Sequence, residues 1–210
     1  MELEELLLRR LAGHRLLKAA ERLSTARALC GVQAQFMSNA MHALRIRCTD
    51  WAAGGAGLVK NWSLRGTVHV FPESDLPLYI RAGDYRKNEW DAPNWWNSRP
   101  DWALSPERQR YFSQAVLEAL ENGPRTREEL RELCRAEGMT PEEEHSMFHP
   151  WGGGLRQLCE RGFMHYAAEE KKEFRPSPVF EPMPEDEARL ELARRYFRNY
   201  GPATVKDAAY

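Results

Sequence analysis

The spacing of apolar residues over the first fifty positions predicts a series of helices. Leucines at 3, 6, 7, 8 and 11 recur at helical spacing and indicate an amphipathic helix over 2–12. A second helical stretch is expected to start near His14. Ser24-Thr25 is expected to cap a short helix that runs through Cys30, with Gly31 just after its end. Apolar residues at 36, 37, 40, 41 and 44 predict a further helix.

The pattern changes to extended chain at 59–71. Val68, Val70 and Phe71 favour strands, and Gly66 indicates a tight turn before them. The first third of the chain is therefore expected to contain helices followed by a small β-hairpin.

A similar order follows a break at 84–102, which holds Pro93, Pro100 and four of the seven tryptophans. Ser105-Pro106-Glu107 is a typical helix start with proline in the first turn. Capping boxes at 126–129 and 140–143 predict two more helices. The pattern then predicts a helix over 151–161 and extended segments at 163–167 and 174–180.

Helices followed by a two-stranded hairpin are typical of the winged helix, a relative of the helix-turn-helix. The predicted fold class is mainly α with small β-hairpins, built from tandem winged-helix domains. The expected divisions are a first winged helix at 1–83, a Trp/Pro-rich connector at 84–104, a second winged helix at 105–182, a linking helix at 183–200 and the start of a third winged helix at 201–210. Because the chain ends three residues after the capping box Thr204-x-x-Asp207, we expect it to be an N-terminal fragment.

Composition places the chain among globular proteins, with 42% hydrophobic and 29% charged residues. No apolar run approaches the roughly 20 residues of a membrane span. The first eight residues carry three glutamates and no basic residue, unlike a secretory signal. A cytoplasmic protein without a membrane partner is expected.

Charge is distributed unevenly, although the formal net charge is only −1. Residues 1–70 hold ten basic and five acidic residues, whereas 71–210 hold twenty basic and twenty-six acidic residues. A polyanion could therefore dock on the first third, although scattered surface charge often produces such an asymmetry.

The cysteines and histidines do not form a recognisable metal motif. The four cysteines include no C-x-x-C pair, which predicts buried free thiols. His145 and His149 have the i, i+4 spacing of metal ligands but no third ligand nearby, so no metal is assigned. No cofactor is implied.

Four segments together resemble one known family: GVQAQ at 31–35, LVKNWSLRGTVHVF at 58–71, TREEL at 126–130 and NYGPATVKDAAY at 199–210. In order and spacing they are similar to the winged-helix DNA-binding family that contains the AlkZ- and YcaQ-like DNA glycosylases. The resemblance covers nearly the whole chain. It implies three tandem winged helices followed by a β-domain, and release of alkylated bases, with possible unhooking of interstrand crosslinks, by the intact protein rather than by this fragment alone. The glycine-rich stretch 53–57 and the tryptophan-rich stretch 90–102 depart from the family pattern.

The resemblance maps the family's catalytic motif onto Gln33 and Gln35, with Ala34 smaller than the usual middle residue. A neutral amide is a poor general base, because it cannot hold a proton near pH 7. An alkylated purine is already cationic and leaves readily, so orienting a water molecule and stabilising positive charge would suffice. Without the resemblance, two such glutamines near a helix start would be interpreted as surface caps.

Further residues are candidates for DNA contacts. Arg65 could hold a phosphate and His69 could line the lesion site, or Arg65 and Thr67 could bond neighbouring loops while His69 packs within its strand. The expected recognition helix and wing of the second unit carry basic residues that could contact phosphates, namely Arg156, Arg161, Lys171, Lys172 and Arg175. A purely structural second unit fits the same residues. The tryptophans Trp90, Trp95, Trp96 and Trp102 are expected to fasten a loop to the core rather than to stack on bases.

These observations predict a monomeric, monofunctional glycosylase that acts on double-stranded DNA containing damaged bases. The motif contains no lysine that could form a Schiff base, which favours a hydrolase over a lyase. The main alternative is a non-catalytic winged-helix regulator, which would dimerise on a palindrome. A protein-interaction fragment is a second alternative, and it predicts no salt-dependent DNA affinity.

Overall fold

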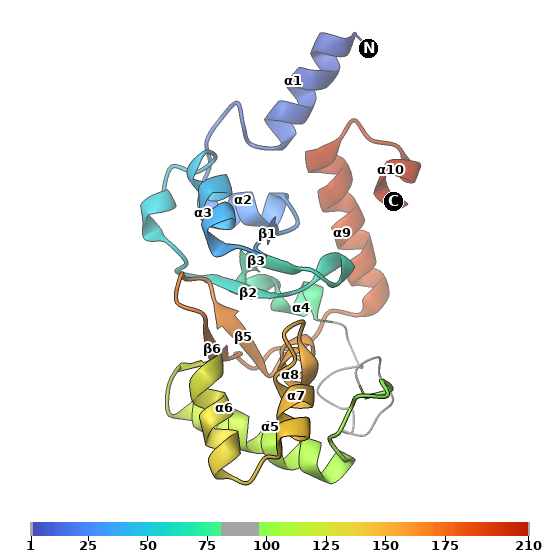
Figure 1. Ribbon diagram of the computed structural model, residues 1–210. Coiled ribbons are helices and arrows are strands. Elements are labelled where there is room, and N and C mark those ends of the chain that lie inside the picture. The colour runs from blue at the N-terminus through green and yellow to red at the C-terminus, as the bar shows by residue number, and fades with distance from the viewer. Residues whose placement is uncertain (1, 81–96, 210) are drawn as a thin grey trace. The chain divides into compact units, whose positions relative to one another are not determined.

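The computed structural model describes residues 2–80 and 97–209. They fall into two compact units, of which the first comprises 2–80, 168–170 and 181–209 and the second 97–167 and 171–180 (Figure 1). Helices and small antiparallel sheets make up both units, which confirms the predicted fold class at this level.

The first unit combines helices with three short strands. Its elements are α1 (Leu3–Gly13), α2 (Arg22–Ala28), β1 (Val32–Gln33), α3 (Met37–Arg45), β2 (Leu58–Trp62), β3 (Val68–Pro72), α4 (Leu76–Tyr79), α9 (Glu185–Tyr200) and α10 (Val205–Ala209), with 3-10 turns η1 (Trp51–Ala53), η2 (Leu64–Gly66) and η3 (Glu73–Asp75). The strands form an antiparallel sheet in the order β1-β3-β2.

Each face of this sheet packs against helices. Val32 and Val70 are paired across β1 and β3 and join the buried cluster that includes residues of α2 and α3. On the opposite face, Phe71 is fully buried and its ring centroid lies 4.4 Å from that of Tyr79 in α4. The strands are short and nearly continuously buried, because both faces are covered.

The second unit is built from helices and a hairpin. Its elements are α5 (Pro106–Glu121), β4 (Arg125–Thr126), α6 (Arg127–Ala136), α7 (Pro141–Met147), α8 (Gly153–Glu160), β5 (Met164–Ala167) and β6 (Glu173–Pro176). Strands β5, β6 and β4 form an antiparallel sheet in that order.

The helix caps of this unit are those expected from the sequence. Ser105 accepts a hydrogen bond from the Arg108 N–H at the start of α5. Thr126 with Glu129 and Thr140 with Glu143 form complete capping boxes at α6 and α7. Local side-chain chemistry therefore determines where these helices begin.

Two expectations for the first unit are wrong. Residues near His14 form turns, and the next helix, α2, begins only at Arg22. Ser24 and Thr25 lie inside α2 rather than at its cap. Thr25 is fully buried, because the face of α2 that carries it packs into the core.

Other expectations can be compared with the described residues. All four cysteines are free and buried, as predicted. Within the described residues, no helix combines the length and the hydropathy that crossing a bilayer would require. Trp90, Trp95 and Trp96 lie outside the described residues, and Trp102 donates its indole N–H to the Leu104 carbonyl at 2.9 Å.

A buried carboxylate connects three segments of the first unit. Asp75, 5% exposed, lies in η3 directly after β3. It accepts hydrogen bonds from Arg195 of α9 at 2.6 Å and from Arg27 of α2 at 3.2 Å. Arg195 also bonds Glu191 at 2.8 Å. This network holds α9 against the segment that follows the sheet.

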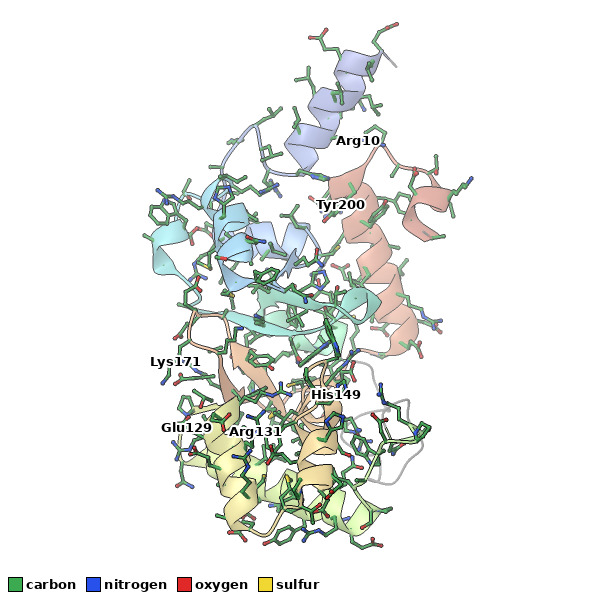
Figure 2. All side chains as sticks on the ribbon, viewed as in Figure 1. Arg10, Glu129, Arg131, His149, Lys171 and Tyr200 are labelled. Carbon is green, nitrogen blue, oxygen red and sulfur yellow. The ribbon has the colours of Figure 1, made fainter. Side chains whose placement is uncertain are left out.

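The end of α9 is attached to the turn after α2. The Tyr200 hydroxyl donates to the carbonyl of Leu29 at 2.8 Å, and its ring stacks on that of Tyr196 with centroids 5.2 Å apart. Nearby, the Arg10 guanidinium donates to the Pro202 carbonyl at 3.2 Å (Figure 2). These contacts tie the last turn of α9, and Pro202 just after it, to two earlier segments of the chain.

Arg195→Ala is expected to lower the free energy of unfolding by about 3–5 kcal/mol, because it leaves the Asp75 carboxylate buried with only the partly exposed Arg27 as a counter-ion. Urea unfolding followed by circular dichroism measures the loss. Arg194→Ala on the same helix, at an exposed position, is the matched control and should change stability by less than about 0.5 kcal/mol. Equal effects of the two substitutions would show that the network contributes little.

A buried histidine makes the stability of the second unit dependent on pH. His165 of β5 is 5% exposed, and its Nδ1 lies 3.1 Å from the Ser177 hydroxyl. Burial, with a smaller contribution from the charge of Arg175, lowers the pKa of His165 to about 4. In the unfolded chain the ring gains its proton near the ordinary pKa of about 6.5.

Stability should therefore fall as the pH drops from about 6.5 to about 4, by roughly 3 kcal/mol from this group, because only the unfolded state takes up the proton. Unfolding free energies of the wild type and of His165→Asn, measured across this range, test the prediction. The variant should show a flatter profile, whereas His42→Asn, at an exposed position, should leave the profile unchanged. A wild-type profile that His165→Asn does not flatten would contradict the assignment.

Candidate functional site

The Gln-Ala-Gln segment lies on and just after an edge strand of the first unit. After α2 the chain reverses through Cys30 and Gly31, both in the left-handed region with φ of 54° and 86°. It then enters β1, where Val32 pairs with Val70 and Gln33 pairs with His69. The N–H of Ala34 extends the pairing by donating to the Val68 carbonyl at 2.8 Å.

Burial alternates through the motif. Ala34 is fully buried, whereas Gln33 and Gln35 on either side of it are exposed. The methyl group of Ala34 belongs to the core cluster that also contains Val32 and Val70. Because one side of this segment is fixed in the core, both amides are directed to the other side. The strand β1 itself was not predicted from the sequence.

Gly31 permits the close approach of the motif to β3. A Cβ at this position would lie 3.2 Å from the Cβ of His69, and its φ of 86° is one that other residues rarely adopt. Substitution of Gly31 would therefore push β1 away from His69 and disturb the position of Gln33.

A row of polar residues crosses the sheet beside Gln33. Asn61 of β2 and Gln33 of β1 are both paired with His69 of β3, so all three side chains emerge on the same face. Asn61 is fully buried and His69 is 5% exposed, which makes the row progressively more accessible toward Gln33.

Hydrogen bonds hold the His69 ring in place. Its Nδ1 lies 3.0 Å from the Ser63 hydroxyl and 3.2 Å from the Thr67 carbonyl. A contact with a carbonyl oxygen requires a proton on Nδ1. The sequence motif signalled His69, but it did not signal Asn61 or Ser63, which lie beside it in the fold.

Cys30 is the nucleophilic side chain nearest to the motif in sequence. Burial raises the pKa of its thiol to about 11, while the charge of Arg195 lowers this pKa and that of Asp75 raises it by smaller amounts. The thiol is therefore protonated near neutral pH and does not supply a thiolate. Lys60 is buried in β2, and strand alternation places it on the face opposite to Asn61 and Gln33.

The turn between β2 and β3 carries two further candidates. The Thr67 hydroxyl donates to the Leu64 carbonyl at 3.2 Å and closes the turn. The backbone of Arg65 lies in η2, and its side chain is outside the part that the structure describes. The structure thus gives Thr67 a local bonding role and His69 a buried strand position.

The basic candidates of the second unit lie on α8 and on the hairpin. Arg156 of α8 pairs with Glu160 at 2.8 Å, and Arg161 at the end of that helix is 6% exposed. Lys171 and Lys172 are both exposed beside β6 (Figure 2 labels Lys171). Lys171 pairs with Glu173, whose hydrogen bond raises the pKa of the ammonium group and keeps it charged.

A pair of histidines also lies in the second unit. His145 and His149 have ring centroids 5.2 Å apart, and His145 Nε2 lies 3.8 Å from Asp101. Among the described residues, no group of three or more potential ligands is arranged to hold a metal ion.

The fold is shared with a solved DNA glycosylase. The structure of Streptomyces sahachiroi DNA glycosylase AlkZ matches with a TM-score of 0.72 at 23% sequence identity, over 98% of this chain and 59% of that chain. The chain belongs to the AlkZ-like DNA glycosylase family, whose profile matches residues 26–210.

A curated relative adds a more specific description. An interstrand DNA cross-link repair glycosylase from Streptomyces sahachiroi is 26% identical over 193 residues. The match covers 85% of this chain and 51% of the relative. The chain thus spans about half the length of the curated relative.

Proposed function

We propose that this chain binds double-stranded DNA and contributes the catalytic motif of a monofunctional glycosylase that hydrolyses the N-glycosidic bond of alkylated bases. The observation that carries this proposal is the geometry of Gln33 and Gln35. They flank the fully buried Ala34, so the backbone that presents both amides is fixed while the amides remain exposed. Membership of the AlkZ-like family supports the same assignment.

The chemistry of the substrate compensates for the weak basicity of the amides. Alkylation at N7 or N3 makes a purine cationic, so the C1′–N bond can break with development of positive charge on the sugar. The carbonyl oxygens of Gln33 and Gln35 can accept hydrogen bonds from one water molecule and can stabilise that charge. The protein's contribution is to orient the attacking water at C1′.

The element order in each unit supports a tandem winged-helix arrangement. In the second unit, helices α5 to α8 precede the hairpin β5–β6. In the first unit, α2 and α3 precede the hairpin β2–β3. We retain the divisions predicted from the sequence, with α9 as the linking helix and α10 as the start of a third unit.

DNA binding would use the exposed cations of the hairpin in the second unit. Lys171 and Lys172 can contact phosphates, and Arg156 lies on the helix that precedes this hairpin. Arg65 and Thr67 of the first hairpin are retained as candidate DNA contacts. The proposed partner is duplex DNA with damaged bases, bound by a monomer. The name of the relative supports interstrand crosslinks as further candidate substrates.

A non-catalytic DNA-binding regulator is the second candidate. The exposed lysines of the hairpin and the helix-rich units suit it equally well. The regulator differs from the glycosylase in two respects. It has no function for the exposed amides of Gln33 and Gln35, and it would act as a dimer on paired half-sites. Light scattering on a complex with one duplex distinguishes a monomer from a dimer.

Gln33→Ala/Gln35→Ala is expected to reduce base release by about 100-fold or more, because the water loses its positioning groups. The substrate is a duplex with one N7-methylguanine, and the released base is quantified by chromatography. The chain is tested alone and as a chimera with the part of the Streptomyces relative that follows the matched region.

Gln114→Ala, an exposed glutamine on α5, is the control and should retain full activity. Both variants should unfold within about 0.5 kcal/mol of the wild type, because the changed side chains are exposed. Undiminished base release by the double variant would show that Gln33 and Gln35 are not catalytic. If neither the unmutated chain nor the unmutated chimera releases the base while both still bind DNA, the regulator is favoured.

Lys171→Ala/Lys172→Ala is expected to weaken binding to undamaged duplexes of different sequence to a similar extent. The slope of log K against log salt should become shallower by about 1 for each phosphate that the protein no longer neutralises. Fluorescence anisotropy at several salt concentrations measures this slope. Lys206→Ala on α10 is the control. An unchanged slope in the double lysine variant would remove this hairpin from the DNA interface.

A further inference from the structure

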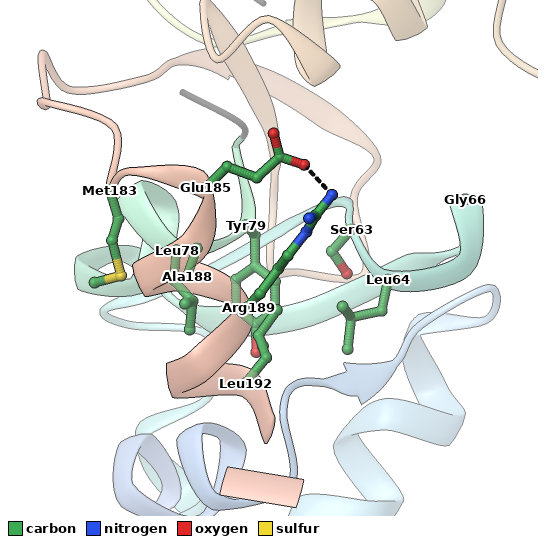
Figure 3. Close-up of a pocket in the computed structure, with 10 residues that line it drawn as sticks. All are labelled: Ser63, Leu64, Gly66, Leu78, Tyr79, Met183, Glu185, Ala188, Arg189 and Leu192. Carbon is green, nitrogen blue, oxygen red and sulfur yellow. Dashed lines mark hydrogen bonds and ion pairs between the residues drawn. The ribbon is translucent and has the colours of Figure 1, made fainter. Parts of the chain in front are cut away.

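A cavity of about 310 Å³ lies within the first unit, between η2, α4 and α9. Its volume is at the lower end of the range of small-molecule sites, about 300–1,000 Å³. The walls combine apolar and polar groups in similar proportion and comprise Ser63, Leu64, Gly66, Leu78, Tyr79, Met183, Glu185, Ala188, Arg189 and Leu192 (Figure 3).

The cavity is linked to the sheet face that carries Gln33. Its wall residue Tyr79 packs on Phe71, which is two positions from His69 in β3 and therefore emerges on the same face. A second wall residue, Ser63, lies 3.0 Å from His69 Nδ1, and His69 is the strand partner of Gln33. The cavity and the Gln33 side chain thus share one face of the sheet.

The wall chemistry suits a flat, positively charged ring. The ring of Tyr79 and the side chains of Leu64 and Leu192 offer apolar surface against which a base can pack. The Ser63 hydroxyl and the Glu185 carboxylate supply acceptors, which a cationic base favours.

The carboxylate at the cavity is engaged in an exposed ion pair. Glu185 accepts a hydrogen bond from Arg189 at 2.5 Å, and Figure 3 shows the guanidinium turned toward it. The two side chains are 50% and 71% exposed, so the pair is screened by solvent and a ligand cation can compete for the carboxylate.

We propose that this cavity receives the alkylated, cationic base of a nucleotide that has been turned out of the duplex. This inference rests on the proposed function and identifies the substrate subsite for it. In the reaction the water oxygen forms a bond to C1′ while the C1′–N bond breaks. The electron pair of the broken C1′–N bond stays with the base and neutralises it, and a proton of the attacking water passes to solvent. Loss of the positive charge removes the attraction to Glu185, which favours release of the product.

Free nucleosides test the subsite without requiring catalysis. In mildly acidic buffer, 7-methylguanosine is cationic whereas guanosine is neutral. An NMR titration of the chain should give tighter binding of 7-methylguanosine than of guanosine. Ala188→Phe fills the cavity from α9 and should weaken this binding about tenfold or more, whereas Ala193→Phe, at an exposed position of the same helix, should leave it unchanged.

Glu185→Gln tests the charge preference at an exposed position where the fold is not at risk. It should reduce the preference for 7-methylguanosine over guanosine roughly threefold, within the range of an exposed ion pair. Glu187→Gln, also exposed on α9, is its control. Binding that neither Ala188→Phe nor Glu185→Gln alters, or no binding at all, would overturn the subsite.

The base-release assay separates this inference from the proposed function. Release by the wild type that persists in a folded Ala188→Phe protein would overturn the subsite while the glycosylase assignment stands. If 7-methylguanosine binds and Ala188→Phe weakens this binding, but no base is released from DNA, the cavity is a nucleobase site and the glycosylase assignment fails. Thermal unfolding of each variant by circular dichroism verifies that it is folded.

Discussion

The organisation of the first unit depends on the buried carboxylate of Asp75. A buried charge of this kind is stable only when its partners are in place, and its partners come from α2 and α9. The helix that leads into the Gln-Ala-Gln motif and the helix that lines the cavity are therefore fixed by the same charge. The cavity consequently forms only when segments more than a hundred residues apart in the chain have come together.

Such a framework explains how a two-residue strand can present the two amides that are the candidate catalytic groups. Strand β1 has too few backbone bonds to be stable alone, and its position is set by the Gly31 turn, the burial of Ala34 and pairing with β3. The amides that it presents are weak bases. In the proposed reaction the charge on the substrate provides the driving force, so rigid positioning matters more than basicity.

Much of the secondary structure could be predicted from the sequence, because it depends on local chemistry. The capping boxes at Thr126 and Thr140, the helix after Ser105 and the hairpin around Gly66 are all signalled by neighbouring residues and are confirmed. The short strands β1 and β4 were not predicted, because their partners lie 36 to 49 positions away in the chain and two residues carry no periodic signal.

The candidate site could be predicted only in part from the sequence. Gln33, Gln35 and His69 were singled out as candidates because they belong to motifs. Asn61 and Ser63 were not, because polar residues in or next to a strand are ordinarily expected to be exposed. The cavity could not be predicted, because its walls come from η2, α4 and α9 and exist only in the folded chain.

Helix α9 also connects the cavity with the turn before the Gln-Ala-Gln motif. Its 16 residues span about 24 Å. Glu185 at its first turn lines the cavity, and Tyr200 at its last turn donates to the carbonyl of Leu29, one residue before the Cys30-Gly31 reversal that leads to Gln33. One helix therefore contacts both the cavity and the turn that leads into Gln33, so the position of α9 sets the spacing between the two.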